Sequence, residues 1–335
     1  MGLAACGGAG DTGDPSLVRP IELEHVRMIV RPDTSAETLW LRRPTRLLHD
    51  PVTGNLLALE RDEQRIVEFT TAGRFLGGFG GRGEGPGKLA NLSAFGVAGD
   101  HVIALDIGNG KLVVFDRATR RMTTEIRLNR VVRDITTIGD TLLVLMPGPD
   151  GSLFELLRPE GGSLSSFGDG GFVAGRCSQC SITYIGGERL AVVKPAFPEG
   201  RIYRIDGTMV DAFAFMELND VLTRWREDFL EMIRRTAGMV ADGSGGRVAA
   251  GKLWVGKPVA LSRGGFLVGV LPEEMDRNPT ELWELDHRGR ITKRYVFGRT
   301  WIGNPTASLS RIYTIGLDGR FEIDEHLLPG VADSH

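Results

Sequence analysis

The sequence predicts an all-β protein built from one repeated four-stranded unit, and three observations support this fold class. Short apolar stretches typical of strands recur along the chain, separated by turns and polar loops. Glycine is abundant, with 46 of 335 residues, which favours many tight turns over long helices. An aromatic residue stands near the end of the third strand in each unit, and these aromatics recur at a nearly regular interval.

The aromatic residues measure the length of the repeat. The first four follow one another at intervals of 46, 39 and 49 residues, close to the roughly 40–50 residues of a β-propeller blade. The next interval is 80 residues, and leaving out a 30-residue helical stretch at 216–245 restores the period. The last interval is only 30 residues. In order, the aromatics are Phe69, Phe115, Phe154, Tyr203, Trp283 and Tyr313.

A closed ring explains the short last unit. A propeller has no exposed sheet edge when one blade takes strands from both ends of the chain. The strand-like segment 21–30 is available to complete that blade. We therefore expect a six-bladed β-propeller of four-stranded antiparallel blades over residues 21–330, closed by an N-terminal strand and carrying one helical insertion. Five and seven blades remain alternatives.

Charge and hydropathy argue against nucleic-acid binding and against a transmembrane helix. The net charge of −3, with no run of basic residues and interleaved aromatics, gives no sign of nucleic-acid binding. No apolar stretch approaches the roughly 18 residues of a transmembrane helix.

The first 20 residues predict a membrane anchor. Leu3-Ala4-Ala5-Cys6 resembles a bacterial lipobox, in which the cysteine thiol accepts the lipid. A polar, glycine-rich stretch suited to a tether follows it. The charged and apolar regions of a signal peptide do not precede it, so a chance run of small residues is the alternative. We expect Cys6 to anchor the protein to a membrane on its extracytoplasmic side, in the cell envelope.

Two segments in the first units resemble a known repeat family. Residues 69–89 read FTTAGRFLGGFGGRGEGPGKL, and residues 104–116 read ALDIGNGKLVVFD. They resemble the strand, the Gly-rich crossover and the central part of NHL repeats. The resemblance implies a six-bladed propeller, and with the lipobox it is similar to bacterial propeller lipoproteins. The later units depart from the repeat pattern.

Three further motifs have structural interpretations. Gly78-Phe-Gly80-Gly-Arg-Gly83 matches a dinucleotide-binding pattern, but Pro86 follows where a helix would have to form, so a blade crossover is favoured. Cys177 and Cys180 form a C-x-x-C, which serves as a local disulfide, a redox dithiol or half of a metal site. Because no second C-x-x-C and no helical pattern accompany it, a local disulfide is the plainest interpretation. Residues 217–236 have the apolar stripe of an amphipathic helix, which packs on a propeller face or serves as a lid.

Two groups of charged residues are candidates for ligand binding. Glu60, Asp106 and Lys194 end the second strands of their units, at turns that gather on one face of a propeller. The innermost strands are expected to begin near a ring of basic residues at the channel mouth, which would favour an anionic ligand. The alternative is that these basic side chains reach solvent or pair with Asp134 and Glu60, and that Asp106 pairs with Lys111 across its loop. The basic candidates are Arg43, Arg46, Arg133 and Lys257.

These features favour a non-catalytic binding protein. Its partner would be a protein, a glycan or a small anionic ligand, and no cofactor, metal or catalytic residue is predicted. The alternative is a metal-dependent hydrolase or lyase resembling the gluconolactonases, whose metal needs converging carboxylate and amide oxygens. Only Glu60, Asp106 and Asn109 suit that role in this sequence.

Overall fold

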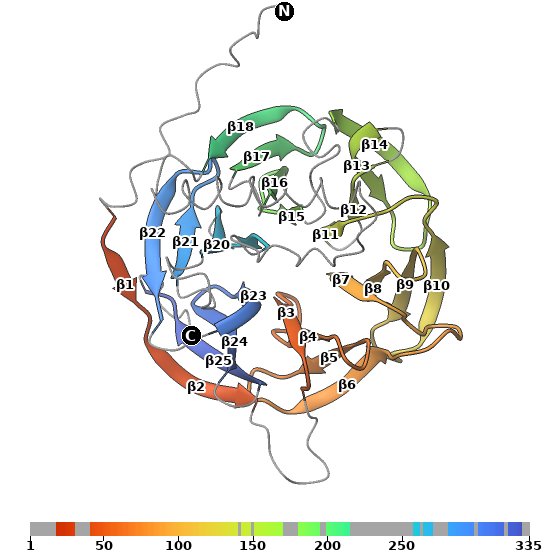
Figure 1. Ribbon diagram of the computed structural model, residues 1–335, viewed down its shortest axis with the longest axis horizontal. Coiled ribbons are helices and arrows are strands. Elements are labelled where there is room, and N and C mark those ends of the chain that lie inside the picture. The colour runs from red at the N-terminus through yellow and green to blue at the C-terminus, as the bar shows by residue number, and fades with distance from the viewer. Residues whose placement is uncertain are drawn as a thin grey trace, which may run out of the picture.

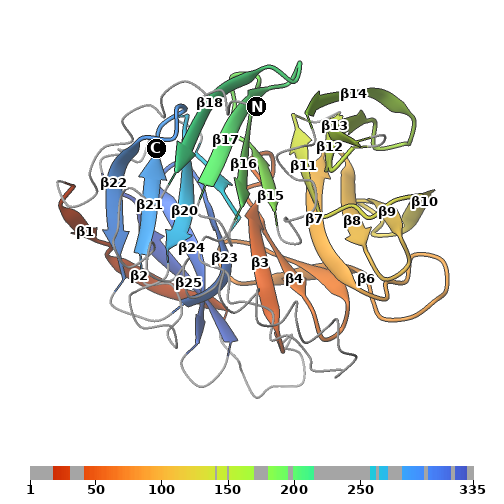
Figure 2. The ribbon, with the colours of Figure 1, turned by 45° about the horizontal axis from the view of Figure 1, so that its top comes forward.

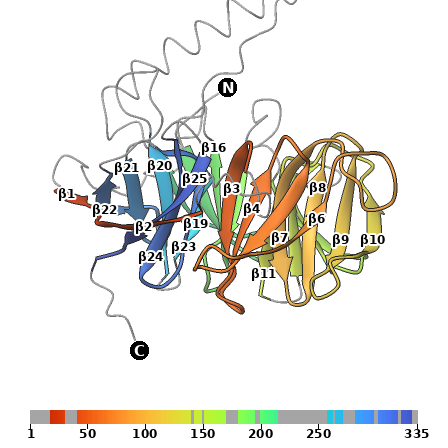
Figure 3. The ribbon, with the colours of Figure 1, turned by 90° about the horizontal axis from the view of Figure 1, so that it is seen from below.

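The protein is a ring of β-sheets around a central axis, as Figure 1 shows in a computed structural model. The structure describes residues 18–30, 41–139, 142–148, 151–169, 180–194, 199–214, 257–261, 264–270, 281–297, 301–317 and 321–329. All regular elements in these ranges are strands. None is a helix that could span a membrane. The strands run across the thickness of the ring, which Figure 3 shows edge on.

Three sheets have four strands each, and every neighbouring pair within them is antiparallel. The first contains β7 (Leu92–Ala98), β8 (His101–Asp106), β9 (Lys111–Asp116) and β10 (Met122–Arg127). The second contains β11 (Asp134–Ile138), β12 (Leu142–Met146), β13 (Ser152–Leu157) and β14 (Ser163–Asp169). The third contains β15 (Ser181–Tyr184), β16 (Arg189–Lys194), β17 (Glu199–Arg204) and β18 (Met209–Ala214).

The other two sheets are larger. A five-stranded sheet contains β19 (Val259–Ala260), β20 (Phe266–Val270), β21 (Glu281–Leu285), β22 (Ile291–Val296) and, at its edge, β1 (Pro20–Glu22). An eight-stranded sheet has the order β2-β25-β24-β23-β3-β4-β5-β6. Its strands are β2 (His25–Val30), β3 (Pro44–His49), β4 (Leu56–Glu60), β5 (Arg65–Phe69), β6 (Phe75–Gly80), β23 (Trp301–Ala307), β24 (Arg311–Leu317) and β25 (Phe321–Leu327).

The prediction of six separate blades is corrected to five hydrogen-bonded sheets. The difference arises at one place, where the innermost strands β3 and β23 form a parallel pair between Arg46 and Asn304. This single pairing joins two antiparallel four-stranded runs, β3–β6 and β23-β24-β25-β2, into the eight-stranded sheet. Sequence spacing predicts the length of a blade, but it carries no information on pairing between neighbouring blades.

The N-terminal part of the chain closes the ring. Strand β2 pairs antiparallel with β25, and the two strands lie side by side in Figures 1 and 2. His25 Nε2 lies 2.9 Å from Asp324 Oδ1, and Arg27 Nε donates to Glu325 Oε2 at 2.6 Å. Residues 25–30 are therefore the closing strand expected within 21–30, whereas β1 pairs in parallel with β22 of the preceding sheet. The helix expected at 217–236, within the predicted insertion 216–245, lies outside the described residues.

The core lies between neighbouring sheets, and the repeat aromatics fill it. All six are at most 3% exposed. Phe79, Phe95 and Phe115 pack in one cluster between β3–β6 and the next sheet. Tyr313 differs from the other five, because it lies on β24, the second strand outward from the axis rather than the third. That one-strand offset explains why the last interval in the sequence is short.

Candidate functional site

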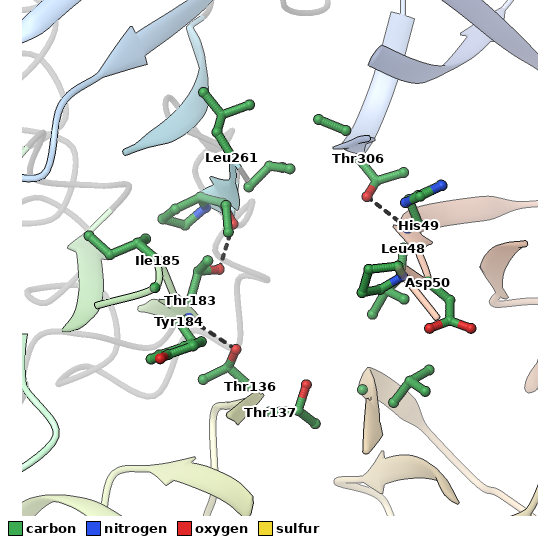
Figure 4. Close-up of a pocket in the computed structure, with 18 of the residues that line it drawn as sticks. Leu48, His49, Asp50, Thr136, Thr137, Thr183, Tyr184, Ile185, Leu261 and Thr306 are labelled. Atoms are coloured by element: carbon green, nitrogen blue, oxygen red, sulfur yellow. Dashed lines mark hydrogen bonds between the residues drawn. The ribbon is translucent and has the colours of Figure 1, made fainter. Parts of the chain in front are cut away.

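A cavity of about 1070 Å³ follows the axis of the ring. Residues of all six innermost strands, β3, β7, β11, β15, β19 and β23, line it, so every sheet contributes to its wall. Figure 4 shows His49 and Thr306 on one side of the space and Thr183 and Tyr184 on the other. Its lining runs from Arg46 to Leu309 in the sequence, so parts of the chain far apart in sequence converge on it.

The cavity has two distinguishable ends. At one end, the turn end, it is lined by the turns that lead from the innermost strands to the second strands, including Val52, Gly139 and Leu309. At the other, the inner end, it reaches Arg46, Ile135 and Lys257, which lie within or just before the first half of the innermost strands. Because inner strands run in the same direction around the ring, each strand carries its early residues to the inner end.

Threonine hydroxyl groups tie the innermost strands together around the cavity. Thr306 Oγ1 accepts a hydrogen bond from His49 N at 2.8 Å. Thr136 Oγ1 accepts one from Tyr184 N at 3.2 Å, and Thr183 Oγ1 donates to Pro258 O at 2.5 Å. The three bonds are the dashed lines in Figure 4. Since these hydroxyls are engaged with backbone groups, the wall is less polar than its threonine content indicates.

Charged side chains gather at the inner end. Asp134 Oδ1 accepts from Arg46 Nη1 at 3.2 Å and from Lys257 Nζ at 2.9 Å. Asp134 Oδ2 accepts from Lys257 Nζ at 2.7 Å and from Ile182 N at 3.0 Å. The guanidinium of Arg46 also stands over the Phe95 ring, 5.6 Å from its centre. Arg46 and Lys257 line the cavity, and Asp134 lies behind them.

Burial sets the protonation of this charged cluster. Burial opposes ionisation of Asp134, but the charges of Lys257 and Arg46 outweigh it and hold the pKa of this carboxyl below its usual value. Burial, reinforced by the charge of Arg46 and opposed by Asp134, lowers the pKa of Lys257 to about 7. Nearer the turn end, burial lowers the pKa of His49, with Asp50 opposing it.

Two of the predicted carboxylates hold turns in place and do not line the cavity. Asp106, fully buried, accepts hydrogen bonds from four backbone N–H groups, those of residues 90, 91, 108 and 109, and from the Asn109 side chain. Glu60, also fully buried, accepts from the backbone N–H groups of residues 43, 62 and 63. Lys111, the expected ion-pair partner of Asp106, pairs with Glu125 instead, with Nζ 2.7 Å from Oε1. Most of the hydrogen bonds to both carboxylates thus come from backbone N–H groups.

The predicted basic residues separate into two groups. Arg46 and Lys257 meet at the cavity, where both contact Asp134. Arg43 and Arg133 are exposed and lie outside the cavity lining. Lys194 ends β16, and its side chain is outside the described part of the structure. The ring of three or more cations expected at a channel mouth therefore appears, among the described residues, as two cations sharing one buried carboxylate.

The cysteine predictions fall largely on residues outside the described ranges. Cys180 is buried and disulfide-bonded. Cys177 and Cys6 both lie outside the described residues, so the expected pair and the expected lipid site stay predictions. Across the described ranges, no group of three or more His, Cys, Asp or Glu side chains is arranged to hold a metal ion.

Sequence reasoning placed Asp134 only as a possible ion-pair partner, whereas the structure makes it the centre of the charged cluster. The signal was available in part, because an aspartate that opens an apolar innermost strand is unusual and needs a buried partner. The partners could not be identified, since Arg46 and Lys257 are 88 and 123 residues away in sequence.

Comparisons with known proteins identify the fold. No family model matches the sequence, and no curated protein matches it. Among solved structures, a Bacteroides fragilis protein assigned as exported is 13% identical with a TM-score of 0.59, covering 93% of this chain and 97% of that one. The WD40 repeats of RRP9 are 11% identical with a TM-score of 0.56, covering 92% and 100%. A virginiamycin B lyase from Staphylococcus aureus is 11% identical with a TM-score of 0.52, covering 89% and 83%.

The chain is a β-propeller of four-stranded antiparallel blades. Identities of this size establish the fold alone, because propellers of one shape serve unrelated functions. The resemblance of the first units to NHL repeats stays a prediction.

Proposed function

We propose that this propeller is a non-catalytic binding protein that takes a small anionic ligand into its central cavity. The observation that carries the proposal is the convergence of six innermost strands on one cavity whose inner end presents Arg46 and Lys257. Large concave sites with few, well-placed polar groups are the usual form of small-molecule binding sites. A protein or glycan held on a propeller face is the alternative kind of partner.

The chemistry of the carboxylates favours binding over metal-dependent hydrolysis or lysis. Such a reaction needs carboxylate oxygens directed at a shared metal. Here Glu60 and Asp106 are directed to backbone N–H groups, and Asp134 is directed to Arg46, Lys257 and Ile182 N. The residues that the sequence offered as metal ligands therefore have structural partners, and the enzyme alternative has no specific observation in its favour.

We further propose that the protein works on the extracytoplasmic side of a membrane to which Cys6 anchors it by a lipid. The lipobox-like Leu3-Ala4-Ala5-Cys6 supports this location, as does the likeness of the fold to a Bacteroides fragilis protein assigned as exported. Expressed behind a complete signal peptide in bacteria, the protein should incorporate labelled palmitate and partition into detergent. Cys6→Ser should abolish both, and equal labelling of that variant would refute the anchor.

Blocking the cavity tests the binding proposal. Thr137 lines the cavity from β11, so Thr137→Trp should fill space that a ligand needs. Ser165 lies exposed on the outer strand β14, and Ser165→Trp is the matched control. We expect saturation-transfer NMR on a mixture of small envelope metabolites to detect ligands with the wild type and the control but not with Thr137→Trp. Equal signals from all three proteins would place binding elsewhere and overturn the proposal.

A further inference from the structure

The inner end of the cavity carries an arginine with unused donors. Within the described residues, the only hydrogen bond from the Arg46 guanidinium runs from Nη1 to Asp134. Arg46 Nε and Nη2 make no hydrogen bond within these residues, and neither atom is fully buried. Because Arg46 lines the cavity, both donors are accessible there. The Phe95 ring beneath the guanidinium fixes its plane. A planar, positioned guanidinium with two accessible donors is the group that pairs with a carboxylate in bidentate geometry.

The charge of the cluster selects the charge of its ligand. With Lys257 protonated, the side chains of Arg46, Lys257 and Asp134 together have a formal charge of +1. All three side chains are at most 10% exposed. Buried charges are most favourable when opposite charges balance, and one monoanion balances these three side chains, whereas a dianion would give them and the ligand a net negative charge.

The wall between the two ends is suited to an apolar group. Thr136, Thr183 and Thr306 direct their hydroxyls to backbone partners, which leaves their methyl groups for the cavity. Apolar side chains line the same wall, namely Val97, Ile135, Val259, Leu261 and Pro305. The other charged lining residues stand nearer the turn end, where Asp50 is paired with Arg117.

The rim at the turn end continues this apolar wall into solvent. Val52 and Leu309 are 70% and 60% exposed, and both line the cavity. They lie on the β3–β4 and β23–β24 turns, whose strands β3 and β23 are paired neighbours. Asp50, which directly follows β3, is four positions after Arg46, about 13 Å along the strand direction. An anionic end at Arg46 would therefore leave the rest of an extended ligand along the wall towards this rim.

We propose that the cavity binds an amphipathic monocarboxylate, with its carboxylate against Arg46 at the inner end and its apolar body directed towards the rim of Val52 and Leu309. This inference rests on the proposed function, because it names the ligand class of the same cavity. Lys257 supports the carboxylate as the second cation, and Asp134 holds both cations in place.

Decanoate below its micelle concentration is the probe, measured by calorimetry against decan-1-ol, decylammonium and decyl phosphate. We expect the wild type to bind decanoate at least about tenfold more tightly than any of these three comparison compounds. Charge-assisted hydrogen bonds to the carboxylate give a difference in affinity of this size. Shortening the chain from decanoate to octanoate and hexanoate should weaken binding by about fourfold for each methylene removed.

Variants locate the two ends of the ligand. Arg46→Gln should weaken decanoate binding about 10–100-fold. The matched control, Arg133→Gln, removes an exposed arginine outside the cavity and should leave the affinity unchanged. Val52→Ser and Leu309→Ser change only exposed rim residues. Both variants should weaken the binding of decanoate and leave the binding of butyrate unchanged. They test the orientation of the ligand if Arg46→Gln fails to fold.

The outcomes separate this inference from the proposed function. Equal affinity for decanoate and decan-1-ol would overturn the proposed carboxylate site. Tighter binding of decyl phosphate than of decanoate would overturn the preference for a monoanion. If no decyl compound binds while Thr137→Trp still abolishes binding of envelope metabolites, the ligand class is wrong and the cavity proposal stands. If Thr137→Trp also has no effect, both proposals fail.

Discussion

Lys257 shows how one buried residue links ligand binding to protein stability. Its Nζ donates to both oxygens of Asp134 and to Ile135 O at 2.8 Å, so the ammonium is held by three acceptors. Burial still removes most of its hydration, and Arg46 adds a like charge nearby. The cluster therefore keeps a cation at the cavity wall at a cost in folding free energy, which is typical of functional sites.

The sign of the resulting pH dependence follows from the lowered pKa. Lys257 loses its proton at about pH 7 in the folded protein, against a usual value of 10.5. Between these values the unfolded chain holds a proton that the folded chain has released, so the free energy of unfolding rises with pH there. The Lys257 contribution is most unfavourable below this window and is relieved across it, by at most about 1.4 kcal/mol for each pH unit.

Urea unfolding in the lower part of that window, from about pH 7 to about pH 9.5, measures this rise. Lys257→Met should remove the rise relative to wild type, whereas Lys88→Met, at an exposed lysine, should retain it. Identical slopes for wild type and Lys257→Met would show that Lys257 stays protonated throughout. The upper limit avoids ionisation of the tyrosines, because burial raises the pKa of Tyr203 and of Tyr313 in the folded protein.

At the residue scale, the sequence identified residue types but not their partners. Asp106 and Glu60 end second strands, as the sequence predicts. Their partners are backbone N–H groups of adjacent turns and incoming strands, which no side-chain pattern in a sequence reveals. Arg46 and Lys257 lie on or beside innermost strands, as predicted, but their contact with Asp134 depends on three different sheets coming together.

Individual strands depend on glycine where a large aromatic crosses a neighbour. Gly200 on β17 stands opposite Phe213 on β18, and a Cβ at Gly200 would lie 2.2 Å from the Phe213 ring. Phe213 is 3% exposed and belongs to the core cluster between the third sheet and the five-stranded sheet. The aromatic ring thus covers the glycine and fills the space that a side chain would take.

Gly200→Ala should lower the free energy of unfolding by about 1–3 kcal/mol, because the Phe213 ring must leave its place in the core. Gly85→Ala is the control: the glycine is exposed, and the nearest atom to an added Cβ is 3.8 Å away on a flexible lysine. That change should be neutral or stabilising by up to about 1 kcal/mol. Urea unfolding compares the two, and equal stabilities would mean that Phe213 moves without cost.

At the element scale, sequence periodicity predicted where strands occur better than it predicted the position of each strand within its blade, counted outward from the axis. Five aromatics lie on third strands as expected, and Tyr313 lies on the second strand of its run. Its apolar surroundings resemble those of the others, since it packs with Leu47 and Phe69 in the core. A sequence pattern records burial, and both strand positions are buried, so the pattern could not distinguish them.

The whole ring depends on contacts between distant parts of the chain. Strand β2 pairs with β25 about 300 residues later in the chain, and β3 pairs with β23 at Arg46 and Asn304. The ends of the sequence predicted the first of these contacts, because a closed propeller needs a completing strand. The second was not predictable. A single residue pair between two blades depends on how closely their innermost strands approach each other, which no sequence pattern records.

Removing the closing strand tests the role of ring closure. Deletion of residues 1–30 removes the backbone hydrogen bonds between β2 and β25. It also removes His25, which contacts Asp324, and Arg27, which contacts Glu325. Asp324 and Glu325 are 1% and 5% exposed, but the His25 and Arg27 side chains are 37% and 51% exposed, so each ion pair contributes at most about 1 kcal/mol and the lost strand pairing adds to this. The thermal midpoint should fall by about 5–10 °C.

The same deletion leaves the edge of β25 without its partner strand, and an unpaired edge is a template for association between chains. We expect the shortened protein to form soluble oligomers or aggregates that light scattering detects after size-exclusion chromatography. Deletion of residues 1–17 is the control, because it removes only residues that precede the described strands and should leave both the midpoint and the mass unchanged. A monomeric protein with an unchanged midpoint after deletion of 1–30 would show that the ring is held closed without β2. Loss of stability in both deletions would instead assign a structural role to residues 1–17.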